Sequence, residues 1–299
     1  MKRFILYSIL FALLTVVLLA VGEVLCRLYP NPYSYKNAWL NRHANEVETL
    51  ILGSSVNYYG INPQLLYGCT FNLAGVSQNF EYDYLLLKRY FANSDSLKRI
   101  MLSVGYATYT DPPLESGHDW MFAQGYRIYM GIDRNPKLSR YGFEIANLNG
   151  YAGKLRNMIT GENSIICDTL GHGTAMSLKN KSPRWIEDIN VTVARHTAPD
   201  FSHVAYNIAY LDSILDWAEY RDIEVILLSP PKHPIYRDQM PVRQKALTTR
   251  ITDSIAVSRS LKWINMTDSP DCSDDDFYDG DHLTSDYGAD RYTLRIRDL

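Results

Sequence analysis

The sequence is poor in cysteine and lacks an excess of positive charge. Four cysteines occur among 299 residues, and 30 lysines and arginines are set against 33 aspartates and glutamates, giving a formal net charge of −3. Because no basic patch stands out, nucleic acid is not an expected partner. The cysteine spacings match no metal motif, so we expect no metal site and no other cofactor. A disulfide between Cys167 and Cys272 is possible in an exported chain, and the state of these two residues and of Cys69 is left open.

Internal repeats, low-complexity segments and a disorder-like composition are lacking as well. Hydrophobic residues make up 46% of the chain and charged residues 21%, as in ordinary globular proteins. Once an N-terminal membrane segment is set aside, about 270 residues remain, enough for one large α/β domain or two small ones.

A long apolar run follows the N-terminus. A Lys-Arg pair precedes an uncharged stretch at residues 4–22, which as a helix is about 28 Å long, close to the thickness of a bilayer core. Positive charge before the run favours a cytoplasmic N-terminus. We therefore predict a single-pass signal anchor over residues 1–29 in the inner (cytoplasmic) membrane, with residues 30–299 on its periplasmic or extracellular side. A cleaved signal peptide is the alternative, because Ala-Val-Gly at residues 20–22 could form a small-residue cleavage site.

Short apolar runs alternate with helical patterns through much of the remaining chain. After a polar linker at residues 23–46, mostly apolar runs predict five buried strands: Val47–Leu52, Cys69–Leu73, Arg99–Val104, Ile223–Leu228 and Lys262–Asn265. The spacing of apolar residues predicts helices over Tyr82–Ala92, Val204–Tyr220 and Pro241–Ser258, and a final helix that starts near Ser285. This alternation predicts a three-layer α/β domain with a mainly parallel five-stranded sheet.

The stretch at about residues 111–200 breaks the alternation. It is rich in glycine, asparagine, tyrosine and polar residues. We interpret it as an insertion in the domain, or a lid over the carboxyl edge of the sheet, where ligands bind in open α/β sheets.

Gly53, Ser54 and Ser55 directly follow the first predicted strand. A nucleophilic serine needs its hydroxyl lifted out of a strand-to-helix turn, and glycine permits such a tight turn. The helix that follows points its N-terminus at the site and can stabilise an oxyanion. Alternatively, the two serines only cap that helix.

A second candidate motif, Asp-Gly-Asp-His at residues 279–282, precedes the last predicted helix. An acid three residues before a histidine can hold the ring through Nδ1, which leaves Nε2 free to accept a serine proton. The acidic segment has two other interpretations. It could be a solvated loop, or a calcium loop that starts at Asp275, although Phe277 at position 3 and Asp286 at position 12 depart from that pattern.

Together the two motifs resemble those of the SGNH, or GDSL-like, hydrolase superfamily. The serine of its first block, Gly-Asp-Ser, matches Ser55, and its fifth block, Asp-x-x-His, matches Asp279 and His282. Ser54 replaces the aspartate, and this Gly-Ser-Ser version resembles the envelope-anchored branch that includes the D-alanyl-lipoteichoic-acid protein and polysaccharide O-acetyltransferases. The resemblance implies a flavodoxin-like α/β/α fold and a catalytic Ser–His–Asp triad. It further implies an oxyanion hole made of the backbone N–H groups of Ser55 and Gly75.

The resemblance covers approximately residues 47–110 and 204–297, and it departs from the family at the third block. The family has an asparagine there that donates to the oxyanion, whereas this chain has Ala107. Loss of one such donor lowers transition-state stabilisation by about 3–4 kcal/mol. Three residues could supply a substitute donor or contact the substrate: Asn79, Tyr106 and Thr108. Lys232 and His233, in a proline-rich loop after the fourth predicted strand, could also contact substrate or could belong to a rigid loop.

The resemblance implies a serine esterase or O-acyltransferase that acts on acylated glycan or a related envelope polymer. Ser55 attacks an ester, His282 accepts its proton, and Asp279 fixes the imidazole tautomer. The expected partners are the membrane, bound through the N-terminal helix, the glycan, and a membrane-bound acyltransferase that presents the acyl donor. The missing asparagine supports an alternative of another class, a catalytically inactive SGNH-like module that binds glycan or scaffolds such an acyltransferase.

Overall fold

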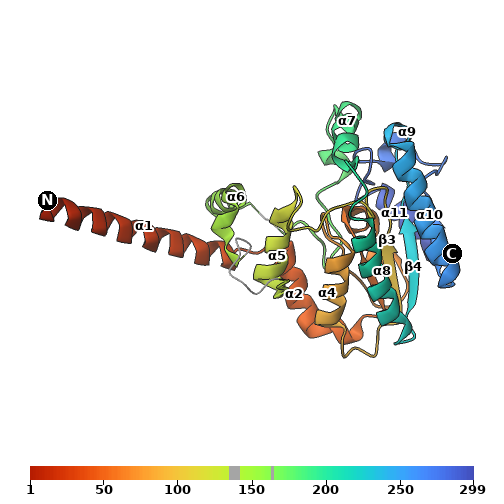
Figure 1. Ribbon diagram of the computed structural model, residues 1–299, viewed down its shortest axis with the longest axis horizontal. Helices are drawn as coiled ribbons and strands as arrows, with labels where there is room; N and C mark the ends of the chain where they lie inside the picture. The colour runs from red at the N-terminus through yellow and green to blue at the C-terminus, as the bar shows by residue number, and fades with distance from the viewer. Residues whose placement is uncertain (135–141, 163–164) are drawn as a thin grey trace. The chain divides into compact units, whose positions relative to one another are not determined.

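The computed structural model describes most of the chain: residues 1–134, 142–162 and 165–299. Its contacts divide the chain into two compact units, both of which are drawn in Figure 1. The first unit contains Met1–Ala38 and Trp120–Ile166, and the second contains Trp39–Asp119 and Cys167–Leu299. The stretch that the sequence marks as an insertion or lid therefore contributes residues to both units.

The first unit is built of helices: α1 (Lys2–Leu28), the start of α2 (Pro32–His43), α5 (Trp120–Met130), η4 (Glu144–Ala146) and α6 (Leu148–Thr160). The helix α1 is long and apolar enough to cross a membrane, with a mean hydropathy of 2.8 over an exposed 18-residue window. Near its end, Glu23 accepts hydrogen bonds from the backbone N–H groups of Glu144 at 3.0 Å and Ile145 at 3.2 Å. These bonds join α1 to its own unit beyond the apolar run.

The polar linker predicted at residues 23–46 is instead mostly helical. The helix α1 continues to Leu28, and α2 is followed by the 3₁₀ turn η1 (Ala44–Glu46). Asn31 caps α2, because its Oδ1 accepts hydrogen bonds from the N–H groups of Tyr33 and Ser34, both at 3.0 Å. A proline at the first helical position is compatible with a helix start, so the Pro-Asn-Pro segment begins a helix where we expected it to end structure.

The second unit contains a fully parallel sheet of five strands. The strands are β1 (Thr49–Leu52), β2 (Thr70–Asn72), β3 (Arg99–Ser103), β4 (Glu224–Ser229) and β5 (Lys262–Asn265). Their order across the sheet is β2-β1-β3-β4-β5, the order of flavodoxin-like folds. The predicted α/β class with five strands is confirmed, and each strand lies where the apolar runs predict it.

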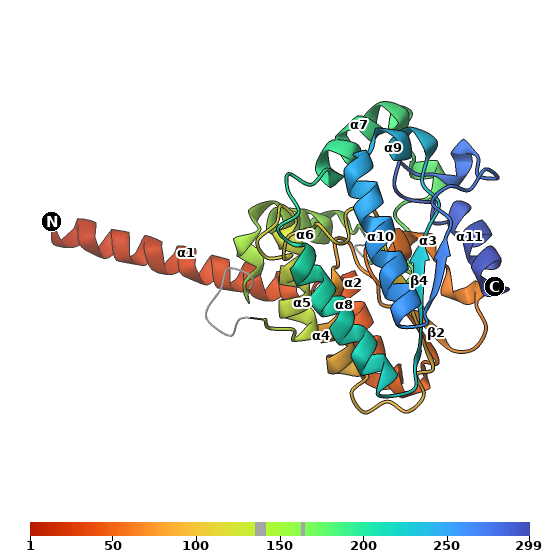
Figure 2. The same ribbon diagram turned by 45° about the vertical axis from the view of Figure 1, so that its right-hand side comes forward.

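Helices cover both faces of this sheet: α3 (Ser55–Gly60), α4 (Phe80–Tyr90), α8 (Val204–Glu219), α10 (Val242–Ser258) and α11 (Gly288–Arg297). Two further helices, α7 (Trp185–His196) and α9 (Pro234–Gln239), pack against each other. Short 3₁₀ turns also occur at η2 (Pro63–Leu65), η5 (Leu178–Asn180) and η6 (Asp274–Asp276). Figure 2 shows α8 and α10 on one face and α3 and α11 on the other; α4 packs against α8. This distribution follows from right-handed crossovers, because the connection from β1 to β2 runs opposite to the later ones.

Alternate residues of the strands build the core beneath α3 and α11. Ile51, Met101 and Ile226 belong to one buried cluster with Tyr292 and Ile296 of α11. The period of two is that of a pleated strand, and it leaves the intervening apolar residues for the other face. Because all five strands are parallel, their carboxyl ends share one edge, and the turns that carry the candidate site residues leave from that edge.

The four cysteines all lie among the described residues, and no disulfide joins any two of them. The Cys167–Cys272 pair that the sequence left open is therefore not formed.

Candidate active site

The turn after β1 presents Ser55 at the first position of α3. Gly53 has a φ of +104°, and a Cβ there would lie 1.9 Å from Ser103 Oγ and 2.9 Å from Ser103 N. Both the backbone conformation and the close approach require glycine. The turn is held from two sides, because Gly53 N–H donates to Asp83 Oδ1 at 2.8 Å and Ser54 N–H donates to Ser103 Oγ at 3.0 Å.

Gly53→Ala is expected to lower the free energy of unfolding by about 2–4 kcal/mol, because the added methyl group meets backbone as well as side chain. Gly153→Ala is the matched control, since nothing lies within 4 Å of a Cβ at this helical position of α6. That variant should be stabilised by about 0.5–1 kcal/mol. Urea denaturation of the full chain measures both, and equal stabilities of the two variants would contradict the geometry of the turn.

The structure brings Ser55, Asp279 and His282 together at the carboxyl edge of the sheet. Ser55 Oγ lies 2.7 Å from His282 Nε2, and His282 Nδ1 lies 3.0 Å from each carboxylate oxygen of Asp279. The Asp279 Oδ1 also accepts the backbone N–H groups of Asp281 and His282, both at 2.8 Å. The carboxylate is thus fixed by its own loop, and the imidazole ring links it to the serine hydroxyl. This is the geometry of a nucleophile, a base and an orienting acid.

Burial and charge act in opposite directions on the histidine and the aspartate. Burial lowers the pKa of His282, but the adjacent Asp279 carboxylate outweighs it, and the net pKa is raised. Burial raises the pKa of Asp279, but the charge and hydrogen bond of His282 leave it below its usual value. Asp279 is therefore ionised at neutral pH, and its charge favours the protonated form of the His282 ring.

Asp83 is a buried acid that contacts the turn at residues 53–55. Besides Gly53 N–H, its Oδ1 accepts Gln78 Nε2 at 2.5 Å, whereas Oδ2 is buried with no hydrogen-bond partner in the described part of the chain. Burial raises the pKa of Asp83 to about 7, despite the opposing hydrogen bonds. The folded state therefore binds a proton that the unfolded state releases between about pH 4 and pH 7, and stability falls as the pH rises through this range.

Asp83→Asn is expected to raise the free energy of unfolding at pH 8 by about 3 kcal/mol and to change it little at pH 4.5. The amide keeps an oxygen for Gly53 and Gln78 and removes the cost of a buried charge. Asp253→Asn, at an exposed position of α10, is the control, and its effect on the free energy of unfolding should be the same at both pH values. Urea midpoints at the two pH values measure the effect; an equal gain at both pH values would show that Asp83 is ionised throughout.

The backbone donors near Ser55 differ from the oxyanion hole that the resemblance implies. The N–H of Gly75 donates to the carbonyl oxygen of Gly53 at 3.1 Å, joining the loop after β2 to the turn at residues 53–55. This donor is already engaged, so the expectation that Gly75 holds the oxyanion is corrected. Ser55 N–H, at the start of α3, has no hydrogen-bond acceptor within the described residues and is left as a donor beside its own hydroxyl.

Two of the three proposed substitute donors, Tyr106 and Thr108, make contacts within the protein. The Tyr106 ring is buried and stacks on Tyr236 with centroids 6.2 Å apart. Thr108 Oγ1 accepts Gly105 N–H at 2.8 Å, a bond that uses the oxygen as an acceptor and not the O–H as a donor.

Asn79, the third proposed donor, caps α4. Its Oδ1 accepts Tyr82 N–H at 3.1 Å, while its Nδ2 is buried and finds no acceptor among the residues that the structure describes. The Asn79 amide therefore has a buried donor that no described residue accepts.

Lys232 and His233 contact the loop at residues 279–282 and do not face a substrate site. The Lys232 side chain is 0% exposed, and its Nζ donates to Asp281 Oδ1 at 2.6 Å and to the Asp281 carbonyl oxygen at 2.9 Å. His233 accepts Ile235 N–H as the cap of α9, and its backbone N–H donates to the Gly280 carbonyl at 3.1 Å. The prediction of substrate contact is corrected for both residues, and the rigid-loop alternative describes them.

Sequence reasoning missed three residues beside the triad: His196, Tyr236 and Asp281. Asp281 Oδ2 lies 3.8 Å from His282 Nε2 and 3.9 Å from His196 Nδ1, and His196 Nδ1 lies 2.7 Å from the Tyr236 hydroxyl. Asp281 could have been found, because it directly precedes the histidine of the motif. His196 and Tyr236 come from α7 and α9, and no spacing in the sequence links them to the site.

No three histidine, cysteine, aspartate or glutamate side chains within residues 1–134, 142–162 and 165–299 are grouped so that they could hold a metal ion. In the acidic segment considered as a calcium loop, the Asp276 carboxylate instead accepts hydrogen bonds from Arg291 Nη1 at 2.5 Å and from the backbone N–H of Ser273 at 2.7 Å. Its carboxylate ties the turn η6 to α11.

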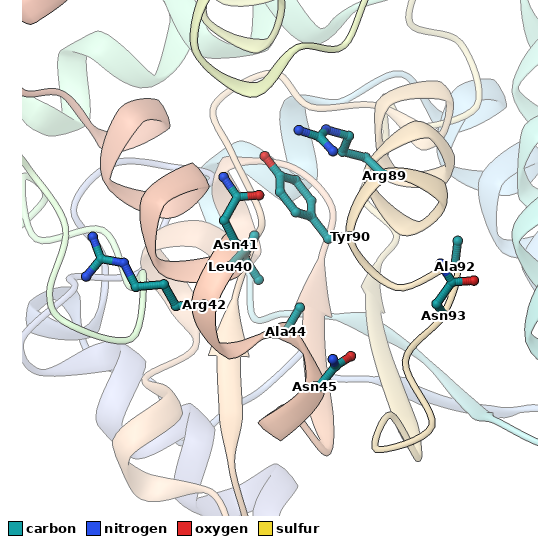
Figure 3. Close-up of a pocket in the computed structure, with 9 residues that line it drawn as sticks. All are labelled: Leu40, Asn41, Arg42, Ala44, Asn45, Arg89, Tyr90, Ala92 and Asn93. Carbon is teal, nitrogen blue, oxygen red and sulfur yellow. The ribbon is translucent and has the colours of Figure 1, made fainter.

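A separate pocket of about 240 Å³ lies between the end of α2 and the end of α4: Leu40, Asn41, Arg42, Ala44, Asn45, Arg89, Tyr90, Ala92 and Asn93 line it (Figure 3). Figure 3 shows Asn41 and Tyr90 directed toward each other and Arg42 pointing away from them. The pocket precedes β1 and β3 in the chain and therefore belongs to the amino edge of the sheet. None of the predicted site residues lines it.

Comparison with known proteins gives remote structural likenesses. No family model and no curated protein matches the chain. A GDSL-like lipase from Bacteroides thetaiotaomicron VPI-5482 is 12% identical, with a TM-score of 0.44 over 90% of this chain and 98% of that one. A protein assigned as an acylhydrolase from Bacteroides fragilis NCTC 9343 is 10% identical, with a TM-score of 0.41 over 85% and 88% of the two chains. A third structure, assigned as a platelet activating factor from Streptococcus pneumonia, is 12% identical, with a TM-score of 0.42 over 96% and 97%.

The class of the second unit is defined by its own sheet order and site geometry. It is a flavodoxin-like α/β domain with a Ser–His–Asp arrangement at the carboxyl edge of the sheet. The serine follows the first strand and the Asp-x-x-His motif precedes the last helix, in the chain positions that the SGNH resemblance implies.

Proposed function

We propose that the chain is a membrane-anchored serine esterase or O-acyltransferase of the SGNH type. The observation that carries this proposal is the 2.7 Å approach of Ser55 Oγ to His282 Nε2, with Asp279 on the opposite ring nitrogen. A serine that only caps a helix has no need of a buried histidine and carboxylate in line with its hydroxyl.

The chemistry is acyl transfer in two steps. Ser55 Oγ attacks the ester carbonyl carbon and gives its proton to His282 Nε2, and the tetrahedral intermediate then collapses as His282 returns the proton to the departing alcohol. An acyl-Ser55 ester remains. Water, or the hydroxyl of an acceptor sugar, loses a proton to His282 and attacks this ester. His282 then returns that proton to Ser55 Oγ as the acid or the new ester is released. Ser55 N–H and Asn79 Nδ2 are the proposed oxyanion donors.

The envelope setting is part of the proposal. The helix α1 supports an anchor in the cytoplasmic membrane, and the Lys-Arg pair before it supports a cytoplasmic N-terminus, with the catalytic domain on the outer side. Acylated glycan or a related envelope polymer is the substrate class that fits such a site. A membrane-bound acyltransferase that presents the acyl donor is the proposed partner when the reaction is transfer.

The test uses the full chain in detergent micelles, treated with a serine-reactive fluorophosphonate and with p-nitrophenyl acetate. We expect the fluorophosphonate to label Ser55, as mapped by peptide mass spectrometry, and we expect this labelling to block ester turnover. Adding a soluble oligosaccharide distinguishes the two reactions, since an acyltransferase yields acylated sugar and an esterase yields only acetate. Labelling at another residue, or turnover that labelling does not block, would remove the proposal.

Two observations favour a second candidate, the inactive module that binds glycan or scaffolds a membrane acyltransferase. Ala107 replaces the family's oxyanion asparagine, and the Gly75 N–H is engaged by Gly53. Absence of both labelling and turnover, with retained binding to envelope glycan, is the outcome that this candidate predicts.

A further inference from the structure

A second buried carboxylate lies beside the triad and has an ammonium partner of its own. Asp281 Oδ2 is 3.8 Å from His282 Nε2, the nitrogen that faces Ser55, and the Asp281 side chain is only 9% exposed. Its Oδ1 lies 2.6 Å from Lys232 Nζ, which is fully buried. Two buried charges of this kind are costly to desolvate unless each has a close partner, so their pairing next to a base calls for a reason.

Lys232 is held rigidly where it meets the catalytic loop. Its backbone N–H donates to the Thr267 carbonyl after β5 at 3.2 Å, and the segment around it contains three prolines. Its Nζ grips both the side chain and the main chain of Asp281. The ammonium therefore fixes the position of the residue directly before His282 as well as its charge.

The other oxygen of Asp281 lies between two imidazole rings. The Tyr236 hydroxyl hydrogen-bonds to Asp281 and to His196 Nδ1, the latter at 2.7 Å. If the Tyr236 hydroxyl donates to the carboxylate, its oxygen must accept the hydrogen bond from His196, so the His196 ring carries a hydrogen on Nδ1. Burial lowers the pKa of His196, so it adds no charge beside His282 at neutral pH.

We propose that Lys232 and Asp281 form a positioning pair for His282: the carboxylate stabilises the imidazolium that forms when Ser55 gives up its proton, and the ammonium holds that carboxylate ionised and in place. At 3.8 Å, Oδ2 is beyond hydrogen-bond distance of Nε2. It acts through its charge and does not take the proton, which stays on Nε2 for the leaving alcohol. The pair strengthens the base in a site whose oxyanion hole has lost two expected donors.

This inference rests on the proposed function, in which His282 is the base. The titratable groups around the ring and its carboxylates come from several elements: Asp279 and Asp281 of its own loop, Lys232 before α9, Tyr236 of α9, Arg195 and His196 of α7, Tyr59 of α3, and Asp111 after β3. For His282, burial lowers the pKa, Asp279 raises it most, Asp281 adds to that rise, and Lys232 opposes it. Removing Asp281 alone and removing both members of the pair must therefore give different results.

The experiment is an NMR titration of the full chain in detergent, with histidine labelled at Cε1 and the His282 signal assigned through His282→Gln. Asp281→Asn should lower the pKa of His282 by about 1 unit or more, because a negative charge is lost and the ammonium stays. The double variant Lys232→Met with Asp281→Asn should lie between that value and the wild type. It contains no unpaired buried charge, so it serves alone if Asp281→Asn does not fold.

Asp274→Asn is the matched control, because this loop carboxylate is 68% exposed and pairs with His233. The His282 pKa should stay within about 0.3 units of the wild type in that variant. Two results would overturn the proposed pair: a similarly small change of the His282 pKa in Asp281→Asn, or a His282 pKa in the double variant as low as that in Asp281→Asn. The titration needs no turnover, so it is separate from the Ser55 labelling that tests the proposed function. In an active enzyme, the acid limb of kcat/KM should move to lower pH by the shift that NMR measures.

Discussion

Replacing Ser55 with alanine is expected to lower ester turnover by the full chain about 10⁴-fold or more and to leave its melting temperature unchanged. The hydroxyl is the atom that would bond to the acyl carbon, and its only recorded side-chain contact in the described structure is with His282 Nε2 at 2.7 Å. Its loss removes the nucleophile without opening the core, because the turn is held by Gly53 and Ser54 through backbone donors. Initial rates with p-nitrophenyl acetate, alongside thermal melts, measure the two quantities.

Ser54→Ala is the matched control for that variant. Ser54 precedes α3, but its side chain makes no capping hydrogen bond, and its bond to Ser103 comes from the backbone N–H that alanine keeps. We expect turnover within a few-fold of the wild type and stability within about 0.5 kcal/mol. Equal losses in both variants would mean that the turn as a whole, and not the Ser55 hydroxyl, is needed. Full activity in Ser55→Ala would place the nucleophile elsewhere.

The sheet and the triad could be predicted because each depends on short-range patterns. Buried parallel strands are short apolar runs, so β1 to β5 could be recognised from composition alone. Asp279 and His282 are three residues apart, and hydrogen bonds within one loop decide their geometry. The position of Ser55 could be predicted because Gly53, two residues earlier, indicates a tight turn.

The polar helix α2 could not be predicted in this way, because its sequence has little apolar periodicity. Its end is fixed by long-range packing, in which Trp39 stacks on Phe71 with ring centroids 4.1 Å apart and Leu40 is 1% exposed. A two-residue contact of this kind leaves no repeating signal in the sequence.

The surroundings of the triad were equally hidden. The pairing of Lys232 with Asp281 joins residues 49 positions apart, and the engagement of Gly75 N–H depends on how two turns meet. A lysine in a proline-rich loop gives no sign of whether it faces solvent or a buried acid. Such contacts follow from the packed fold, so the motif identifies the candidate catalytic residues and only the structure identifies what supports them.

Asp279→Asn is expected to lower kcat about 10⁴-fold through the tautomer of His282, with little loss of stability. Asp279 Oδ1 accepts two backbone N–H groups at 2.8 Å, so the asparagine must keep its oxygen at that position. Its NH₂ group then replaces Oδ2, which lies 3.0 Å from His282 Nδ1. The retained Oδ1 also lies 3.0 Å from Nδ1, but the amide NH₂ beside it favours the neutral tautomer with hydrogen on Nε2, in which Ser55 faces a donor in place of a base.

The same substitution should lower the pKa of His282, because the carboxylate that raises it is gone. The acid limb of the residual activity therefore moves to lower pH, while the plateau falls. Asp275→Asn is the control, since its side chain is exposed on the same acidic segment and it contributes its backbone carbonyl, not its carboxylate, to Thr284. A plateau in Asp279→Asn within tenfold of the wild type would show that the ring chooses its tautomer without Asp279. A normal plateau with a shifted acid limb would mean that Asp279 acts only through its charge. Charge sets the pH at which His282 loses its proton and becomes a base, whereas the tautomer decides whether Nε2 can accept the Ser55 proton at all.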